Sequence, residues 1–216
     1  MDKNIELRFK NQAKSKVFNN IIDIFGLNKK SVFDIGCSNG EFLIHFGPNS
    51  LGITIVQDEV VYGRSKGLNI QRGNIEYDDL SISENSFDVI FANNLLEHLY
   101  SPHNFLNKIK KYLKKDGLLI LGVPCIPVLR CLLNFNKFRG SLAVSHINFF
   151  NRYTLIKTVE RSGWNILNVR GFRFKNKVMD RFLDLIYPHF YVIAQVNHDF
   201  KYFPKRMKEL IGYNND

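Results

Sequence analysis

The sequence has few cysteines and no long uncharged apolar run. Three cysteines among 216 residues form no C-x-x-C pair and leave one unpaired in any disulfide scheme, which favours reduced core residues over disulfides or metal ligands. No stretch of about 18 uncharged apolar residues occurs, because prolines and an arginine interrupt the most apolar segment, residues 118–133. The N-terminus is polar and basic, unlike a signal peptide. We therefore expect a cytoplasmic protein without a transmembrane segment.

Acidic residues are scarce in the second half of the chain. The formal net charge is +10, and residues 101–216 hold 20 Lys and Arg against 7 Asp and Glu, whereas residues 1–100 hold 10 against 13. Such a surplus attracts an anionic partner, for example a nucleotide sugar, a phosphorylated glycan, RNA or an anionic membrane surface. Lysines that merely solubilise exposed helix faces give the same count, so composition leaves both interpretations open.

Strand-like and helix-like patterns alternate along the chain. Strands are expected at 31–35, 51–55, 68–72, 86–92, 117–123, 164–170 and 190–196. Helices are expected at 3–26, 40–46, 58–66 and 102–115, the last beginning at Ser101-Pro102, and again in the segment that starts at Asn151. This alternation predicts one α/β domain over residues 1–216, with a mostly parallel sheet covered by helices on both faces.

Two segments do not fit the alternation. Residues 124–150 and 171–189 follow the fifth and sixth expected strands and are rich in Phe, Arg and Pro. Insertions at the ligand-binding end of a sheet often form lids, so both are candidates for an acceptor lid. The alternative is a helical cap that only completes the core.

The turn in VFDIGCSNGEF, residues 32–42, lacks the glycines of a phosphate-binding loop. Gly36 would open a G-x-G-x-x-G motif, but Ser38 and Glu41 stand at its other two glycine positions, and no P-loop motif occurs. The preceding strand ends with Asp34. A carboxylate there favours a ligand that carries an ammonium or sulfonium charge over a phosphate. The turn therefore predicts a site for a cationic ligand at a strand-to-helix crossover.

Four segments in register resemble the class I S-adenosylmethionine-dependent methyltransferases of the type 11/23-like subgroup, over about residues 30–165. They are VFDIGCSNGEFL, LGITIVQDEVVYGRSKGLNIQRGNIE, SFDVIFANNLLEHLYSPHNFLNKIKKYLKKDGLLILGVP and HINFFNRYTLIKTVERSGW. The resemblance implies a Rossmann-like sheet of seven strands in the order 3-2-1-4-5-7-6, with the last strand antiparallel. It also implies S-adenosylmethionine as the cofactor.

By matching positions, the resemblance implies a cofactor site. The Gly36–Gly40 loop would pass under the methionine part of the cofactor, and Asp34 would support it through backbone amides or water. Asn74 stands where the family usually has an aspartate that bonds the adenine amine, and its carbonyl oxygen can accept the same bond. Asn93 would offer backbone groups near the amino end of the ligand. The implied cofactor-binding residues are Asp34, Gly36, Cys37, Ser38, Gly40, Thr54, Ile55, Glu59, Asn74, Ile75 and Asn93.

One position departs from the family pattern. The second strand of the family usually ends in an acid that accepts bonds from both ribose hydroxyls, whereas Thr54 stands here. The G-I-T-I sequence resembles a variant of the cyclopropane-fatty-acid-synthase type, in which a polar side chain five residues further on shares this task. Glu59 holds that position. Alternatively, Glu59 only stabilises the N-terminus of the next helix.

A hydroxyl acceptor benefits from a general base, and histidine titrates near neutral pH. The candidates are His98, after the fourth strand, and His146, at the end of the first insertion, while Glu97 would orient a neighbour. Each histidine could instead have only a structural role. No His, Cys or carboxylate group shows the sequence spacing of metal ligands, so no metal site is expected.

The sequence therefore predicts an enzyme that methylates a small molecule or glycan, with oxygen of a sugar or nucleotide-sugar-like acceptor as the expected target. One alternative is an RNA methyltransferase that uses the basic second half, although no aromatic RNA-binding pattern occurs. Another is a non-catalytic binding or scaffold module of the same fold, since Ser38, Thr54 and Asn74 weaken the usual cofactor contacts.

Overall fold

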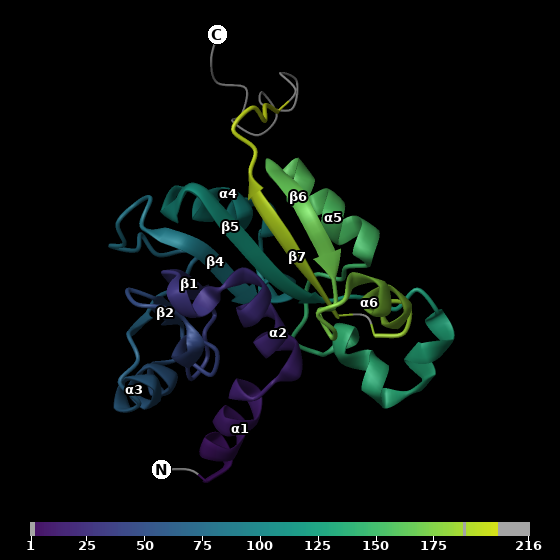
Figure 1. Ribbon diagram of the computed structural model, residues 1–216, viewed down its shortest axis with the longest axis horizontal. Coiled ribbons are helices and arrows are strands. Elements are labelled where there is room, and N and C mark those ends of the chain that lie inside the picture. Colours follow the sequence, from purple (N-terminus) through teal and green to yellow (C-terminus); the bar gives the residue numbers. More distant parts are fainter. Residues whose placement is uncertain (1–2, 188, 203–216) are drawn as a thin grey trace.

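A seven-stranded sheet forms the centre of the computed structural model, which describes residues 3–187 and 189–202 (Figure 1). The strands are β1 (Val32–Ile35), β2 (Leu51–Thr54), β3 (Ile70–Arg72), β4 (Phe87–Asn93), β5 (Leu113–Pro124), β6 (Trp164–Arg170) and β7 (His189–Val196). Their order is β3-β2-β1-β4-β5-β7-β6, and β7 runs antiparallel to both neighbours while the other pairs are parallel. The expected α/β class and strand order are confirmed.

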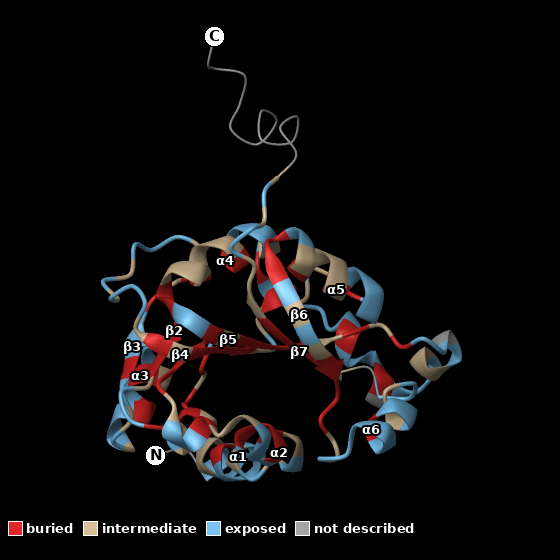
Figure 2. Ribbon diagram, turned by 45° about the horizontal axis from the view of Figure 1, so that its top comes forward, coloured by how far each residue is buried: buried red, intermediate tan, exposed pale blue. Residues whose placement is uncertain are grey.

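Helices cover both faces of the sheet (Figure 2). On one face, α4 (Pro102–Lys108) and α5 (Arg152–Arg161) enclose a core that contains Phe33, Ile90 and Trp164. On the other face, α1 (Lys3–Ala13) and α2 (Lys16–Phe25) lie below the sheet. Strand residues alternate between the two cores because successive side chains point to opposite faces. Helix α3 (Gln57–Ser65) packs beside β2 and β3 at the sheet edge.

The first expected helix is divided in two. Ser15 separates α1 from α2, and its hydroxyl accepts a hydrogen bond from the Phe18 backbone N–H at 3.5 Å. The second helix ends at Gly26, as expected, with the glycine in the left-handed region (φ 62°). The buried face of α2 carries Phe18 and Ile21, which pack against β1, β4 and β5. The N-terminal segment thus belongs to the core of the domain.

The helix expected at 40–46 is wrong. This described stretch contains only the 3₁₀ turn η2 (Leu43–His45). Gly40 has φ 87°, and Pro48 disfavours helical geometry at the residue before it, so too few residues remain for an α-helix. Phe42 and Phe46 instead pack against the ring of Phe18 from α2, at centroid distances of 4.2 and 5.7 Å. Helix α2 therefore fills the layer that the expected helix would have occupied.

The helix expected at 102–115 begins as predicted and ends early. The Ser101 hydroxyl accepts from the Asn104 N–H, and Pro102 is the first helical residue. The chain then tightens into the 3₁₀ helix η4 (Ile109–Tyr112), which buries both of its end residues, and β5 begins at Leu113. Side chains three residues apart align in a 3₁₀ helix, which suits these two buried residues.

The two insertions lie beside each other at one end of the sheet (Figure 1). The first contains η5 (Arg130–Asn134) and η6 (Asn136–Leu142), and the second contains α6 (Lys177–Leu183). The Phe138 and Tyr187 rings, one from each insertion, lie 6.0 Å apart. Among the described residues, no helix is long and apolar enough to cross a membrane.

Candidate functional site

The loop after β1 is held in a left-handed conformation at the carboxyl edge of the sheet. Gly36, Ser38 and Gly40 have φ values of 77°, 49° and 87°. The backbone amides of Gly36 and Cys37 both donate to the Ile53 carbonyl, at 2.9 and 3.0 Å. Because glycine adopts positive φ without steric cost, two of these three positions are unstrained. The loop is therefore attached to the end of β2 and turns across the edge where ligands bind in open α/β sheets.

Glu59 joins this loop to the end of β2. Its carboxylate accepts a hydrogen bond from the Ser38 hydroxyl at 3.0 Å and a short one from the Thr54 hydroxyl. Thr54 is buried and Glu59 is half-buried in the first turn of α3. An acid thus stands at the end of the second strand although the strand itself ends in threonine. The structure brings together Thr54 and Glu59, which the resemblance placed at the ribose, and adds Ser38 from the loop after β1.

A cavity of about 440 Å³ lies beyond the ends of β2 and β3. Two predicted cofactor residues, Ile55 and Asn74, line it, together with Arg72, Gly73 and Asp78. The side-chain oxygen Oδ1 of Asn74 already accepts a hydrogen bond from the Glu76 backbone N–H at 2.9 Å. The backbone N–H of Asn74 donates to the Asp78 carboxylate. One lone pair of the Asn74 oxygen remains for a ligand.

Asp34 is a buried carboxylate with an unpaired oxygen. Its side chain lies at the end of β1, 2% of the residue is exposed, and Oδ2 has no hydrogen-bond partner among the described residues. Burial, followed by the nearby charge of Glu41, raises the pKa of this carboxyl well above its usual range. The loop amides that could have bonded it donate to Ile53 instead, so support through the amides of Gly36 and Cys37 is not seen. A buried unpaired acceptor of this kind suits a cationic ligand.

Asn93 also has an unpaired buried oxygen, at the end of β4. A Cβ atom added at Gly122, on the neighbouring strand β5, would lie 2.2 Å from that Oδ1 atom. Glycine at position 122 therefore leaves the space that the Asn93 side chain occupies. The side chain, rather than the backbone alone, is a candidate ligand contact.

Two predicted residues direct their side chains into the core, and a third, Gly40, is required by packing. Cys37 packs with Leu43, Val60 and Ile70 in a small core cluster, and Ile75 lies in the main core, so only their backbones can face a ligand. A Cβ at Gly40 would meet Leu68 at 2.5 Å. Packing beneath the loop therefore requires this glycine.

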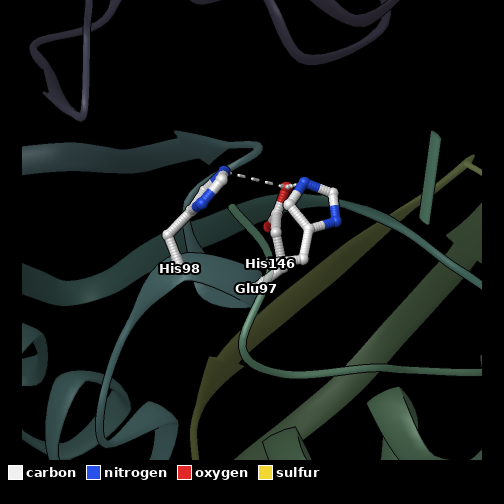
Figure 3. Close-up of side chains that lie close together, drawn as sticks. All are labelled: Glu97, His98 and His146. Carbon is white, nitrogen blue, oxygen red and sulfur yellow. Dashed lines mark ion pairs between the residues drawn. The ribbon is translucent and has the colours of Figure 1, made fainter. Parts of the chain in front are cut away.

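A second group of polar side chains lies directly after β4 (Figure 3). Glu97 and His98 belong to the 3₁₀ turn η3 (Leu96–His98), and His146 comes from the first insertion. Both histidine Nε2 atoms lie 3.9 Å from Glu97 Oε1, and the rings are 4.7 Å apart. Burial raises the pKa of the Glu97 carboxyl to about 7. The E-H pair was visible in the sequence, but the approach of His146 depends on the fold of the insertion.

This group adjoins the loop after β1. Leu95, two residues before Glu97, is the nearest side chain to Gly36, since an added Cβ there would lie 3.2 Å from its Cδ1 atom. The backbone amides of Ile147 and Asn148 both donate to the Glu97 carbonyl at 3.0 Å. The insertion is thereby docked on η3, and the histidines lie at the same edge of the sheet as the glycine loop.

Known proteins with similar sequences are methyltransferases. A family model described as a methyltransferase domain matches residues 9–169. The ubiquinone biosynthesis O-methyltransferase of Glaesserella parasuis is 33% identical over 109 residues, which cover 45% of this chain and 46% of that protein. The (S)-coclaurine N-methyltransferase of Papaver somniferum is 32% identical over 106 residues, or 44% and 30% of the two chains. The matches thus span less than half the length of these curated relatives.

Solved structures extend the likeness to most of the chain. A TehB-like SAM-dependent methyltransferase from Corynebacterium glutamicum superposes with a TM-score of 0.62 at 18% identity, covering 90% of this chain and 97% of that one. At this level of identity the likeness concerns the fold.

Proposed function

The chain belongs to the methyltransferase domain family and is an S-adenosylmethionine-dependent methyltransferase, and from that premise we propose that it methylates a hydroxyl oxygen of a small-molecule or glycan acceptor. The observation that carries the choice of oxygen is the histidine pair beside the glycine loop. A hydroxyl must lose a proton as it attacks, and an imidazole Nε2 near neutral pH is suited to take it.

The residues at the edge of the sheet fit S-adenosylmethionine. The Gly36–Gly40 loop would hold the methionine part, the unpaired oxygens of Asp34 and Asn93 would face its cationic end, and the 440 Å³ cavity would hold the adenine. Ser38, Thr54 and Glu59 would contact the ribose. The cofactor supplies a methyl group already activated on sulfur, so the protein mainly has to orient the acceptor and exclude water.

His146 is the better placed of the two candidate bases. Its side chain is 9% exposed, and its Nδ1 atom lies 3.2 Å from the Ser141 carbonyl oxygen. Because a carbonyl can only accept, Nδ1 carries the proton, which leaves a lone pair on Nε2 for the acceptor proton. An ionised Glu97 would stabilise the imidazolium that results. His98, at 36% exposure, would assist from the solvent side.

An anionic acceptor fits a second cavity of about 520 Å³ between the two insertions and β6. Asp184 is the one acid among its lining residues. Four cationic side chains also line it, namely Arg152, Arg170, Lys177 and Arg181. This supports the two insertions as an acceptor lid, and a nucleotide sugar or similarly charged glycan as the acceptor class.

We expect a Glu59→Gln variant to bind S-adenosylmethionine about tenfold more weakly than the wild-type protein. The reason is loss of the charge that would accept the ribose hydroxyls, since a charge-assisted hydrogen bond contributes about 1.5 kcal/mol or more. Calorimetric titration measures the affinity. The matched control is Asp58→Asn, which removes the exposed neighbouring charge. Equal affinities for the two variants would contradict a ribose contact by Glu59.

The proposed function is tested in two steps. The full chain is first titrated with S-adenosylmethionine and S-adenosylhomocysteine, for which micromolar binding is expected. Methyl transfer is then measured on acceptors, beginning with nucleotide sugars, with RNA retention followed as salt is raised. Transfer to RNA together with steeply salt-dependent retention would favour the RNA alternative. No binding of either ligand to the folded protein would overturn the cofactor site and favour a scaffold role.

A further inference from the structure

The cluster of Glu97, His98 and His146 contains three lone-pair donors that face one another without a hydrogen-bond donor between them. His98 Nδ1 lies 3.0 Å from the Ser145 carbonyl oxygen, and His146 Nδ1 lies 3.2 Å from the Ser141 carbonyl oxygen. Since carbonyls only accept, both Nδ1 atoms carry the ring proton and both Nε2 atoms present a lone pair. Each lone pair faces a carboxylate oxygen at 3.9 Å (Figure 3).

Glu97 cannot relieve this arrangement through other contacts. Its side chain is 1% exposed, and neither carboxylate oxygen has a hydrogen-bond partner in the described part of the chain. A buried carboxylate without a partner is costly, and two neutral imidazole lone pairs beside it add repulsion. A proton on Glu97 or on an imidazole would relieve this repulsion, and so would a metal ion bound at the centre of the cluster.

We propose that Glu97, His98 and His146 bind one divalent transition-metal cation. Their ligand atoms all lie within 4.8 Å of one another, so modest side-chain movement would bring them to bond lengths of about 2.0–2.2 Å from a common ion. Two imidazoles and one carboxylate are a ligand set for Zn²⁺ with an open position, and also for Mn²⁺ or Fe²⁺. Imidazole ligands disfavour Mg²⁺ and Ca²⁺.

The surroundings resemble the outer shell of a metal centre. Histidine ligands usually donate their second ring N–H to a backbone carbonyl, which fixes the tautomer and the ring orientation, and both histidines do so here. His98 is the most exposed of the three ligands, so an ion can enter on that side. The sequence spacing that argued against a metal does not apply, because the insertion brings His146 to the η3 turn.

A metal ion in this cluster would take part in the proposed methyl transfer, and this role rests on the proposed function. An ion held by three protein ligands keeps at least one open position at the acceptor edge of the sheet. An acceptor hydroxyl in that position would release its proton more readily, since a bound cation lowers the pKa of a coordinated oxygen. In the metal-bound protein the histidines would act as ligands in place of a free Nε2 base, and the hydroxyl proton would pass to solvent water on the exposed His98 side.

Metal binding is measured directly on the full chain. The protein is dialysed against a chelator and titrated with Zn²⁺ in a calorimeter, in a Cys131→Ser background because that exposed thiol can bind zinc by itself. We expect one equivalent to bind with micromolar or tighter affinity. The melting temperature should rise by about 5 °C at saturating metal, since the ion binds only the folded cluster.

Matched variants locate the site. His146→Gln and Glu97→Gln should each weaken Zn²⁺ binding at least about 100-fold and abolish the thermal shift, whereas His198→Gln, an exposed histidine outside the cluster, should change neither. His98→Gln serves if either buried variant fails to fold. Unchanged affinity in a folded cluster variant, or no saturable binding to the wild-type protein, would overturn the proposal. S-adenosylmethionine titration of the same samples tests the cofactor site separately, so either failure is recognised on its own.

Discussion

An Asp34→Asn variant is expected to be more stable than the wild-type protein and to bind S-adenosylmethionine at least about 100-fold more weakly. The carboxylate is buried, and its Oδ2 atom has no partner among the described residues, so ionisation costs free energy in the folded chain. Removing the charge should raise the free energy of unfolding by about 1–2 kcal/mol at pH 8. The same change removes the carboxyl group that would ionise beside the cationic end of the cofactor.

The stability gain should depend on pH in a definite direction. Burial raises the pKa of Asp34 above its usual range, so above about pH 4 the folded chain retains a proton that the unfolded chain releases. The wild-type protein therefore loses stability as pH rises through this window, and the variant does not. The advantage of Asp34→Asn should grow from pH 4 to pH 8, as measured by chemical denaturation.

Asp88 provides the opposite control. Burial raises its pKa, but hydrogen bonds from Lys114 and Ser31 outweigh this effect and lower the pKa. Its contribution is present above the pKa of the unfolded chain and is lost as pH falls. Asp88→Asn should therefore destabilise the protein at pH 8 and leave cofactor affinity unchanged. If Asp34→Asn behaves like Asp88→Asn, the assignment of Asp34 to the cofactor site is wrong.

Replacing Gly36 with valine is expected to abolish measurable cofactor binding, a loss of at least about 100-fold. Gly36 has φ 77°, and an added Cβ would lie 3.2 Å from Leu95 Cδ1, so a branched side chain must displace both the loop and the residue that precedes the histidine cluster. A β-branched residue at this φ is strained wherever it occurs. The combined displacement would move the loop from the position in which it holds the ligand.

Gly67 provides a control that separates the effect of backbone strain from an effect on the cofactor site. It has the same φ of 77°, and an added Cβ meets nothing within 4 Å. Gly67→Val should lower the melting temperature but retain cofactor affinity, as measured by circular dichroism and calorimetry. Gly36→Ala is the milder variant if Gly36→Val does not fold, and about a tenfold loss is expected for it. Equal binding by the folded Gly36 and Gly67 variants would contradict the role of the loop.

The strands could be predicted from sequence because each buried run is short and is bounded by turn residues. The helix expected at 40–46 could not be excluded from its apolar spacing, since Phe42 and Phe46 are half-buried against the core as that spacing implies. What decided the conformation was the distant ring of Phe18, which fills the layer from another helix. A local sequence pattern contains no information about such a tertiary contact, so it could not predict this conformation.

The candidate site was predictable to a similar degree. Position matching located Ser38, Thr54 and Glu59, and the hydrogen bonds between them agree with the idea that Glu59 takes over from a missing strand-end acid. The unpaired oxygen of Asp34 could not be foreseen, because it depends on where the loop amides donate. The approach of His146 to Glu97 likewise depends on how the insertion docks.

The place of β7 in the sheet determines when during synthesis the domain can be completed. Strand β6 is the edge strand and pairs with β7, which is made later and lies between β6 and β5. Until residues 189–196 leave the ribosome, β6 has no partner strand and the edge of β5 is open. The core around helix α2 is also incomplete until then, because it includes Tyr191 and Ile193. The nascent chain therefore exposes an open strand edge and an incomplete apolar core until residues 189–196 have been made, and both features favour aggregation during this interval.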